Sequence, residues 1–386
     1  MELTILLPLV IVLSSLSGVS STSRNFTSMF TLGDSYMDTG NFVIMASPAI
    51  PTVFDKPPYG MTFFGHPTGR YSDGRVIIDF IAEALGLPLL PAFLSNSSDV
   101  SRGVNFAVGG ATAIDVGFFE RNNLVQFKLL NNSLHVQLGW FEELIRPSLC
   151  NATEGVPQRA LSAILTTCLL QRRTHHSRFP YGTRTLVILL VIFKSLFIVG
   201  EFRIKDYNFL WMANKTEDEV RSYMPRVVKI IVSAVERLII RDGAAFVVVP
   251  GNPPNGCSPA ILTMFRSPNA ADYDSIGCLR GINAVARQHN ALLRAALGGL
   301  RGQAPPRHHH LRRLLRTRVV RDVLKACCGT GGAYNWNASS VCGMPGATAC
   351  RNPAAYVSWD GVTTRRPSTA TWPKGGSTGL TPIRRY

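Results

Sequence analysis

A short glycine-containing turn carries the residue best suited to nucleophilic chemistry. Residues 29–32 form an apolar run that is followed at once by Gly33-Asp34-Ser35. This pattern predicts a strand that ends in a tight turn. A serine at that place exposes its hydroxyl at the carboxyl edge of a sheet and can point its backbone N–H at an oxyanion. Ser35 is therefore the candidate nucleophile, although the triplet taken alone favours an ordinary turn.

The string around Ser35 is more specific than the triplet. FTLGDSYMDTGN, residues 30–41, closely resembles the first block of the plant GDSL esterase/lipases, in which this serine is the nucleophile. The resemblance covers about three-quarters of the chain in family order, through the strings KPPYGMTFFGHPTGRYSDGRVIIDFIAEALGLP, GVNFAVGGATA, SLFIVGEF, DYNF, VVVPGNPPNGCSPAILTMF, ADYDSIGCLRGINAVARQHNALLRAAL, LKACCGTGGAYNWN and AAYVSWDGV. It implies hydrolysis of acyl esters without a metal or cofactor.

The resemblance also assigns the partners of Ser35. Asp360 matches the acid that orients a general-base histidine. The backbone N–H groups of Ser35 and Gly110 match two oxyanion donors, with Gly109 as the neighbouring alternative. Without the resemblance, Gly109-Gly110 would be interpreted as a tight turn, and both interpretations can hold together.

Two family positions carry other residues here. The family has Gly-x-Asn-Asp where this chain has Arg203-Ile204-Lys205-Asp206, so Lys205 replaces an oxyanion-binding amide. The family also has histidine three residues after the acid, and Thr363 stands there. Threonine cannot accept the serine proton near neutral pH, and His289, in a predicted helix, is expected to be a core or surface residue. The sequence therefore predicts impaired catalysis.

The elements that must position these residues alternate between strands and helices. Strands are predicted at residues 29–32, 195–199 and 245–249. Helices are predicted at residues 76–85, 217–241 and 279–297, with Pro225 expected to kink or delay the second. This alternation favours a parallel sheet covered on both sides. The resemblance implies that this is a three-layer α/β/α domain of the flavodoxin-like SGNH hydrolase type, and we expect about five parallel strands with the site at their carboxyl edge.

The beginning of the chain favours secretion. Residues 5–13 are almost all apolar and are followed by small residues, which predicts a signal peptide over residues 1–23 before one domain over 24–386. A buried first element is the alternative, and the run is short for a membrane span. Six Asn-x-Ser/Thr sites for glycosylation agree with an extracellular or cell-wall location: Asn25, Asn96, Asn131, Asn151, Asn214 and Asn337.

The eight cysteines also fit an oxidising compartment. Cys257 and Cys278 bracket a loop between a predicted strand and helix, and we expect them to form a disulfide. Four later cysteines should form further bridges with undetermined pairing: Cys327, Cys328, Cys342 and Cys350. Cys168 should be unpaired. No Cys/His spacing typical of a zinc site occurs, and the run of histidines at 308–310 fits a solvated basic loop.

The net charge of +16 is confined to three unusual segments. Residues 156–194 hold six basic and no acidic residues, residues 301–325 hold eight and one, and residues 362–386 hold five and none. Their excess of positive charge is larger than that of the whole chain. This clustering argues against a nucleic-acid-binding face, which would spread over one surface of the fold.

These segments are interpreted as errors of reading frame or splicing. A shift of two bases after residue 362 can convert the tail into His-Asp-Ala-Glu-Ala-Val-Tyr-Arg-Tyr, which resembles the family's last block. A similar but weaker argument applies to residues 308–320. Residues 156–194 interrupt family-like sequence on both sides and fit a translated intron, with a genuine insertion as the alternative. We expect residues 156–194, 301–325 and 363–386 to pack poorly.

The sequence thus leaves two functions open. The first is a secreted esterase, expected to be a monomer, that acts on a small acyl-ester or lipid substrate with reduced activity. The second is a non-catalytic secreted glycoprotein that keeps the pocket and binds acylated or glycosidic ligands. Residue 363 of the true transcript would distinguish them.

Overall fold

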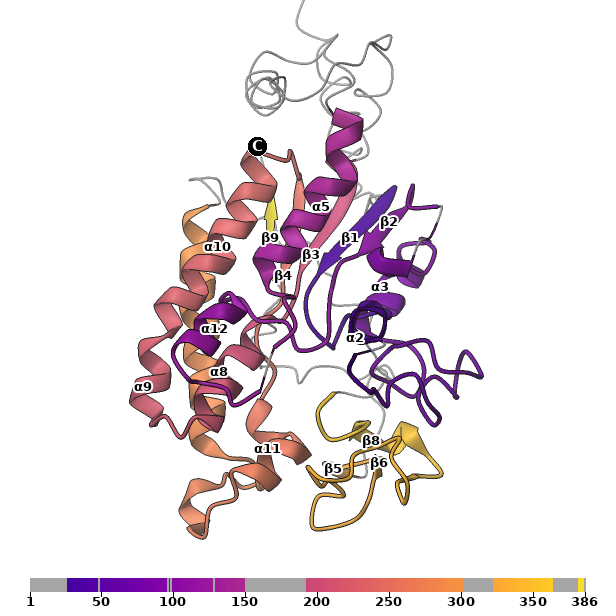
Figure 1. Ribbon diagram of the computed structural model, residues 1–386. Coiled ribbons are helices and arrows are strands. Elements are labelled where there is room, and N and C mark those ends of the chain that lie inside the picture. Colours follow the sequence, from indigo (N-terminus) through magenta and orange to yellow (C-terminus); the bar gives the residue numbers. More distant parts are fainter. Residues whose placement is uncertain are drawn as a thin grey trace, which may run out of the picture.

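The chain folds around a mixed sheet flanked by helices (Figure 1). The computed structural model describes residues 26–47, 49–95, 97, 99–127, 129–149, 192–300, 322–363 and 381–384. The strands are β1 (Ser28–Leu32), β2 (Gly103–Asn105), β3 (Ser195–Val199), β4 (Phe246–Val249), β5 (Asp322–Ala326), β6 (Cys328–Gly329), β7 (Thr348–Ala349), β8 (Tyr356–Ser358) and β9 (Thr381–Arg384). The helices are α2 (Asn41–Ala46), α3 (Ile77–Ala84), α4 (Val116–Arg121), α5 (Leu134–Leu149), α8 (Arg203–Met212), α9 (Glu217–Ser222), α10 (Met224–Ile240), α11 (Pro259–Met264) and α12 (Arg280–Gly299).

Five strands form the central sheet in the order β2-β1-β3-β4-β9. The first four are parallel, in agreement with the expected α/β class. The expectation of five parallel strands is wrong in one respect, because β9 pairs antiparallel with β4. An antiparallel edge strand needs no crossover helix, and such strands are common at the edge of otherwise parallel sheets.

The two faces of the sheet bury different side chains, as the period of two along each strand requires. On one face, residues such as Phe30, Phe197 and Val247 pack with side chains from α5, α10 and α12. On the other face, Met29 and Ile198 pack with α3. Helices therefore cover both sides of the sheet, as expected for a three-layer domain.

The predicted helix over residues 217–241 is two helices that meet at Tyr223. Pro225 lies in the first turn of α10, where its missing N–H breaks no intrahelical hydrogen bond. The Thr216 hydroxyl accepts a hydrogen bond from the Glu219 amide at the start of α9. Pro225, expected to kink or delay one helix, instead lies at the start of a second helix.

A small layer held by disulfides lies beyond the carboxyl edge of the sheet, below it in Figure 1. It contains the pairs β5-β8 and β6-β7. Its cysteines are joined as Cys327–Cys350 and Cys328–Cys342, which settles the pairing that the sequence left open. The layer brings residues 356–363 next to the loop that follows β1.

Most of the unusual segments lies outside the described residues. So do the expected signal peptide, Cys168 and the histidines at 308–310. Four pieces of these segments are described: residues 192–194, residues 322–325 in β5, Thr363, and residues 381–384, which form β9. β5 and β9 each pair with a neighbouring strand, and Ile192 and Thr363 are buried, but the expectation of poor packing over the three segments stays a prediction.

Candidate active site

Ser35 lies in the turn that follows the fully buried strand β1. Gly33 fixes this turn through two hydrogen bonds, because its N–H donates to the Gln137 Oε1 atom and its carbonyl accepts from Gln137 Nε2, both at 2.9 Å. Ser35 is 3% exposed, and its Oγ atom has no hydrogen-bond partner within the described part of the chain. The turn thus presents a buried, unpartnered hydroxyl.

Asp38 joins the serine turn to the glycine pair. Its carboxylate accepts hydrogen bonds from the backbone N–H groups of Gly40, Asn41 and Phe42, and a fourth from Gly109 at 2.7 Å. Burial raises the pKa of Asp38 to about 6, while these four donors act in the opposite direction. The carboxylate therefore sets the position of the glycine pair relative to the turn that carries the serine.

Gly110 is the better oxyanion candidate of the two glycines. The Gly109 N–H is already engaged with Asp38, and a Cβ atom at Gly109 would lie 1.9 Å from the Tyr71 hydroxyl. Gly110 has φ +84°, which favours glycine. Its N–H donates to no partner among the described residues. This favours Gly110 as the donor with a free N–H.

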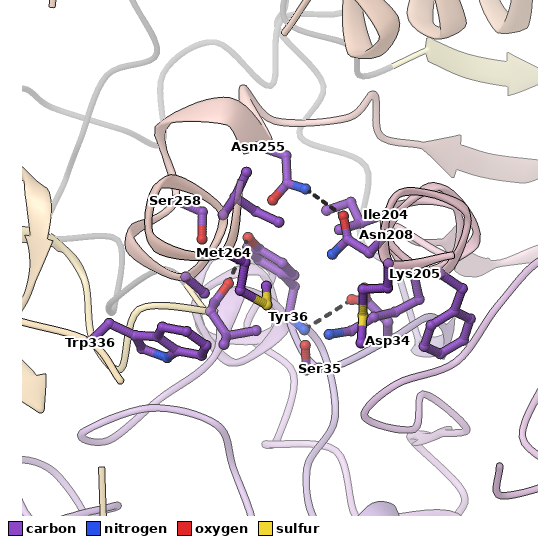
Figure 2. A pocket seen from close by; sticks show the side chains of 15 residues that line it. Asp34, Ser35, Tyr36, Ile204, Lys205, Asn208, Asn255, Ser258, Met264 and Trp336 are labelled. Atoms are coloured by element: carbon purple, nitrogen blue, oxygen red, sulfur yellow. Dashed lines mark hydrogen bonds between the residues drawn. The ribbon is translucent and has the colours of Figure 1, made fainter. Parts of the chain in front are cut away.

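A pocket opens beside Ser35 (Figure 2). Its walls come from the turn after β1, from α8, from the segment that leads into α11, and from the disulfide-held layer. The lining residues are Asp34, Ser35, Tyr36, Ile204, Lys205, Asn208, Phe209, Met212, Asn255, Ser258, Ala260, Ile261, Met264, Trp336 and Val362. Most of these side chains are apolar, so the pocket suits an acyl or aromatic group.

Lys205 enters the pocket from the first half of α8, on the wall that also holds Ile204 and Asn208 (Figure 2). It is half-buried. Burial lowers the pKa of the Lys205 ammonium, and the nearby carboxylates of Asp34 and Asp360 partly oppose this effect. A lysine thus occupies the place where the resemblance puts an oxyanion-binding amide.

Asp360 is enclosed by donors. Its Oδ1 atom accepts hydrogen bonds from the backbone N–H groups of Val362 at 3.0 Å and Thr363 at 2.8 Å, and lies 2.9 Å from the Thr363 hydroxyl. Its Oδ2 atom accepts from the Tyr59 hydroxyl at 2.9 Å. Burial raises the pKa of Asp360, and the hydrogen bonds lower it. Thr363 therefore supplies two of the four donors to this carboxylate.

The structure brings only some of the predicted residues to the pocket. Ser35 and Lys205 line it directly, whereas Gly110, Asp360 and Thr363 lie outside its lining. His289 is buried in α12, and its Nδ1 atom lies 2.6 Å from the Tyr207 hydroxyl. His289 is thus a core histidine and does not line the pocket.

Several positioning residues escaped prediction. Asp206 accepts hydrogen bonds at 2.8 Å from the N–H groups of Ala113 and Ile114, so it holds the segment after the glycine pair against α8. Tyr59 and Gln137 are likewise identified only by their contacts. Asp206 and Tyr59 lie inside strings that resemble the family, but partners far away in the sequence define their roles.

The other predicted sites lie away from the pocket or at its rim. Cys257 and Cys278, the predicted pair, form a disulfide with Cα atoms 4.5 Å apart. Of the glycosylation candidates, Asn131, Asn214 and Asn337 are described and exposed, and Asn25, Asn96 and Asn151 lie outside the described residues. The described residues contain no cluster of His, Cys, Asp or Glu suited to a metal ion. No described helix has the length and hydrophobicity needed to cross a membrane.

Comparisons with known proteins agree with the geometry. A family model described as GDSL-like Lipase/Acylhydrolase matches residues 29–366. A GDSL esterase/lipase of Arabidopsis thaliana is 37% identical over 352 residues, which cover 88% of this chain and 79% of that protein. Acetylajmalan esterase 2 of Rauvolfia serpentina is 35% identical, with 87% and 85% covered. Sinapine esterase of Brassica napus is also 35% identical, with 88% and 82% covered.

Proposed function

The chain belongs to the GDSL-like lipase/acylhydrolase family of carboxylic ester hydrolases, and we propose that it is a secreted esterase in which Ser35 is the nucleophile and the rate is low. The observation that carries this proposal is the Ser35 hydroxyl, which is buried, has no hydrogen-bond partner among the described residues and belongs to a residue that lines a largely apolar pocket. A serine nucleophile needs such a hydroxyl next to a site where an ester carbonyl can be placed.

The oxyanion would be held by backbone groups. The N–H groups of Ser35 and Gly110 have no acceptor among the described residues, so both remain available. Donors of this kind stabilise the negative charge that develops on the carbonyl oxygen, and loss of one typically costs roughly 100- to 1,000-fold in rate. The missing amide at position 205 accounts for one such loss.

The low rate follows mainly from position 363. Thr363 is 2% exposed, and its hydroxyl lies within hydrogen-bond distance of both the Tyr71 carbonyl and the Asp360 carboxylate. It offers no basic atom to Ser35. In a serine triad, loss of a member can leave only a roughly 1,000- to 10,000-fold advantage over water.

The pocket and the relatives favour a small acyl ester as the substrate. Two relatives are named as esterases of acetylajmalan and of sinapine. The apolar lining from Ile204, Phe209 and Ile261 would hold an acyl or aromatic group, with the carbonyl beside Ser35. We propose a monomer that uses no cofactor.

A non-catalytic binding protein is the second candidate. The substitutions at Lys205 and Thr363 favour it, because they remove both the family's base and its oxyanion amide while the pocket persists. In that case the chain would bind acylated or glycosidic ligands without cleaving them. Such binding should change the fluorescence of Trp336, which lines the pocket, when the ligand is titrated into the protein.

Secretion is supported by the apolar leader at residues 5–13 and by three disulfides within the described part of the chain. Disulfides persist in oxidising compartments. Expression of the full chain in plant cells should release a protein whose first residue lies near 20–24, with glycans on Asn131, Asn214 or Asn337. Mass spectrometry of the culture medium checks both, and retention of residues 1–23 would contradict the leader.

The catalytic proposal is tested with p-nitrophenyl butyrate and a fluorophosphonate. The purified chain should hydrolyse the ester far more slowly than an active relative, and the probe should label Ser35 covalently. Ser35→Ala should remove both signals. Hydrolysis or labelling that is unchanged in Ser35→Ala would refute Ser35 as the nucleophile, and an ordinary enzyme rate that depends on Ser35 would refute the impairment.

A further inference from the structure

Ser35 and Lys205 share one pocket although they come from distant parts of the sequence. Ser35 follows β1, and Lys205 lies on α8, which follows the neighbouring strand β3. Figure 2 shows both side chains at the same cavity, with Asp34 beside them. The Ser35 Oγ atom has no hydrogen-bond partner among the described residues. The same pocket is thus lined by a lysine and by a serine whose hydroxyl makes no hydrogen bond to it or to any other described residue.

No described histidine is available as a base for this hydroxyl. His289 is buried against Tyr207, and neither His66 nor His135, both exposed, lines the pocket. Asp360 is not an alternative, because both of its carboxylate oxygens already accept hydrogen bonds, three of the four donors being on residues 362 and 363. Lys205 is the nitrogen base that lines the pocket within the described part of the chain.

We propose that Lys205 is the general base of this chain and that the slow hydrolysis runs through a Ser35–Lys205 dyad. The proposal rests on the esterase function proposed above. Lysine serves as the base for a serine nucleophile in known variants of the triad. Lys205, which differs from the family residue, would then supply part of the base function that is lost with threonine at position 363.

The proton and the acyl group can be followed through both halves of the reaction. The Ser35 Oγ–H bond breaks, its proton passes to Lys205 Nζ, and Oγ forms a bond to the ester carbonyl carbon. The carbon–alkoxy bond then breaks, and the ammonium returns the proton to the leaving alcohol. Water next loses a proton to Nζ and attacks the acyl carbon, after which the proton returns to Ser35 Oγ as the carboxylic acid leaves.

The surroundings of Lys205 act on its charge in two directions. Burial disfavours the ammonium and so lowers the pKa of Lys205. The charged groups that face it are the carboxylates of Asp34 and Asp360, which favour the ammonium. Tyr36, which also lines the pocket, has a pKa well above its ordinary value because it is buried, and it stays neutral. The balance leaves a larger fraction of neutral amine than in a solvent-exposed lysine.

Substitution of Lys205 by asparagine gives opposite results under the two interpretations. If Lys205 is the base, Lys205→Asn should slow labelling of Ser35 by a fluorophosphonate about 100-fold or more, the typical contribution of a general base. If the lysine is only a poor substitute for an oxyanion amide, the same variant restores the family residue and should speed labelling. Labelling is stoichiometric, so intact-protein mass spectrometry measures it even when turnover is slow.

Two variants control this experiment. Lys205→Arg keeps the positive charge but cannot accept a proton near neutral pH, so it should be as slow as Lys205→Asn. Lys215→Asn makes the same change on the surface, where Lys215 is paired with Glu219, and should label at the native rate. Circular dichroism of each variant shows whether the fold is kept. Labelling at the native rate in folded Lys205→Arg would overturn the proposal.

The pH dependence provides a second readout. The labelling rate of the native chain should rise with pH as the Lys205 ammonium loses its proton. The rise should occur at a pH below the ordinary pKa of lysine, and it should be absent in Lys205→Asn. An identical rise in both proteins would overturn the dyad. Failure of the esterase function is distinct, because it would appear as labelling that persists in Ser35→Ala or is absent from every variant.

Discussion

The hydroxyl of Thr363 lies 2.9 Å from the Oδ1 atom of Asp360 and 2.7 Å from the Tyr71 carbonyl. The acid that should orient a catalytic base is thus in contact with a residue that cannot act as one. Asp360 is buried and its four donors are in place, so this corner of the structure is fully hydrogen-bonded with a threonine at position 363. The consequences of that arrangement can be measured.

Substitutions at positions 205 and 363 should be strongly non-additive. In the native chain, Lys205→Asn removes the proposed base and lowers activity. Together with Thr363→His and the family-like tail, the same change restores an oxyanion amide and should raise activity. The combined variant should gain several orders of magnitude, since loss of the base from a triad costs roughly 1,000,000-fold in a well-studied case.

A double-mutant cycle on kcat/KM with p-nitrophenyl butyrate measures this reversal. The matched control is Ser35→Ala in the combined variant, which should remove the whole gain. Equal effects of Lys205→Asn in both backgrounds would show that the two positions act independently, contrary to the dyad.

Tyr59→Phe should destabilise the fold. Tyr59 is buried, and its hydroxyl donates to the Asp360 Oδ2 atom, so the substitution leaves a buried carboxylate oxygen without that donor. A hydrogen bond to a charged group contributes about 1.5 to 3 kcal/mol, and the free energy of unfolding should fall by that amount. Urea denaturation measures it. Tyr334, which is half-buried in the small disulfide-held layer, provides a control for the loss of a tyrosine hydroxyl. An equal fall in the free energy of unfolding in Tyr334→Phe would contradict a specific role for Tyr59.

Lys205→Met should stabilise the protein at neutral pH. The pKa of Lys205 is lowered in the folded state, so the unfolded chain binds more protons between that value and 10.5. The free energy of unfolding therefore rises with pH through that window as Lys205 loses its proton. Below the window Lys205 is fully charged in the folded state, and its destabilising effect is largest. The gain in melting temperature from Lys205→Met should shrink as the pH approaches 10.5. A gain that is constant with pH would indicate packing as its cause.

Removal of the Cys257–Cys278 disulfide should weaken both the fold and the pocket. The bridge closes a loop that contains α11, and α11 supplies Ile261 and Met264 to the pocket wall. Replacement of both cysteines by serine should lower the free energy of unfolding by roughly 3 kcal/mol in the chain-entropy treatment. Labelling of Ser35 by the fluorophosphonate should slow as well. Unchanged labelling at a temperature where the variant is folded would show that the loop holds its position unaided.

Much of the scaffold could be predicted because local patterns determine it. The apolar run that ends at Gly33 forms β1, and the runs at 195–199 and 246–249 form β3 and β4. The helices near 77–84 and 280–299 follow from apolar spacing, and Pro225 marks the start of α10. The direction of β9 could not be predicted, since strand pairing depends on where the chain returns to the sheet.

For the site itself, the sequence determined which residue types are present at the family positions: a serine nucleophile candidate, an acid at 360, and departures at 205 and 363. The tertiary structure decided how they meet. It placed Lys205 at the pocket of Ser35, engaged the Gly109 N–H with Asp38 and left Gly110 free, and enclosed Asp360 between Tyr59 and Thr363. These relationships join residues up to 301 positions apart. Hydrogen bonds and burial act through space, and only the packed fold defines which groups are neighbours in space.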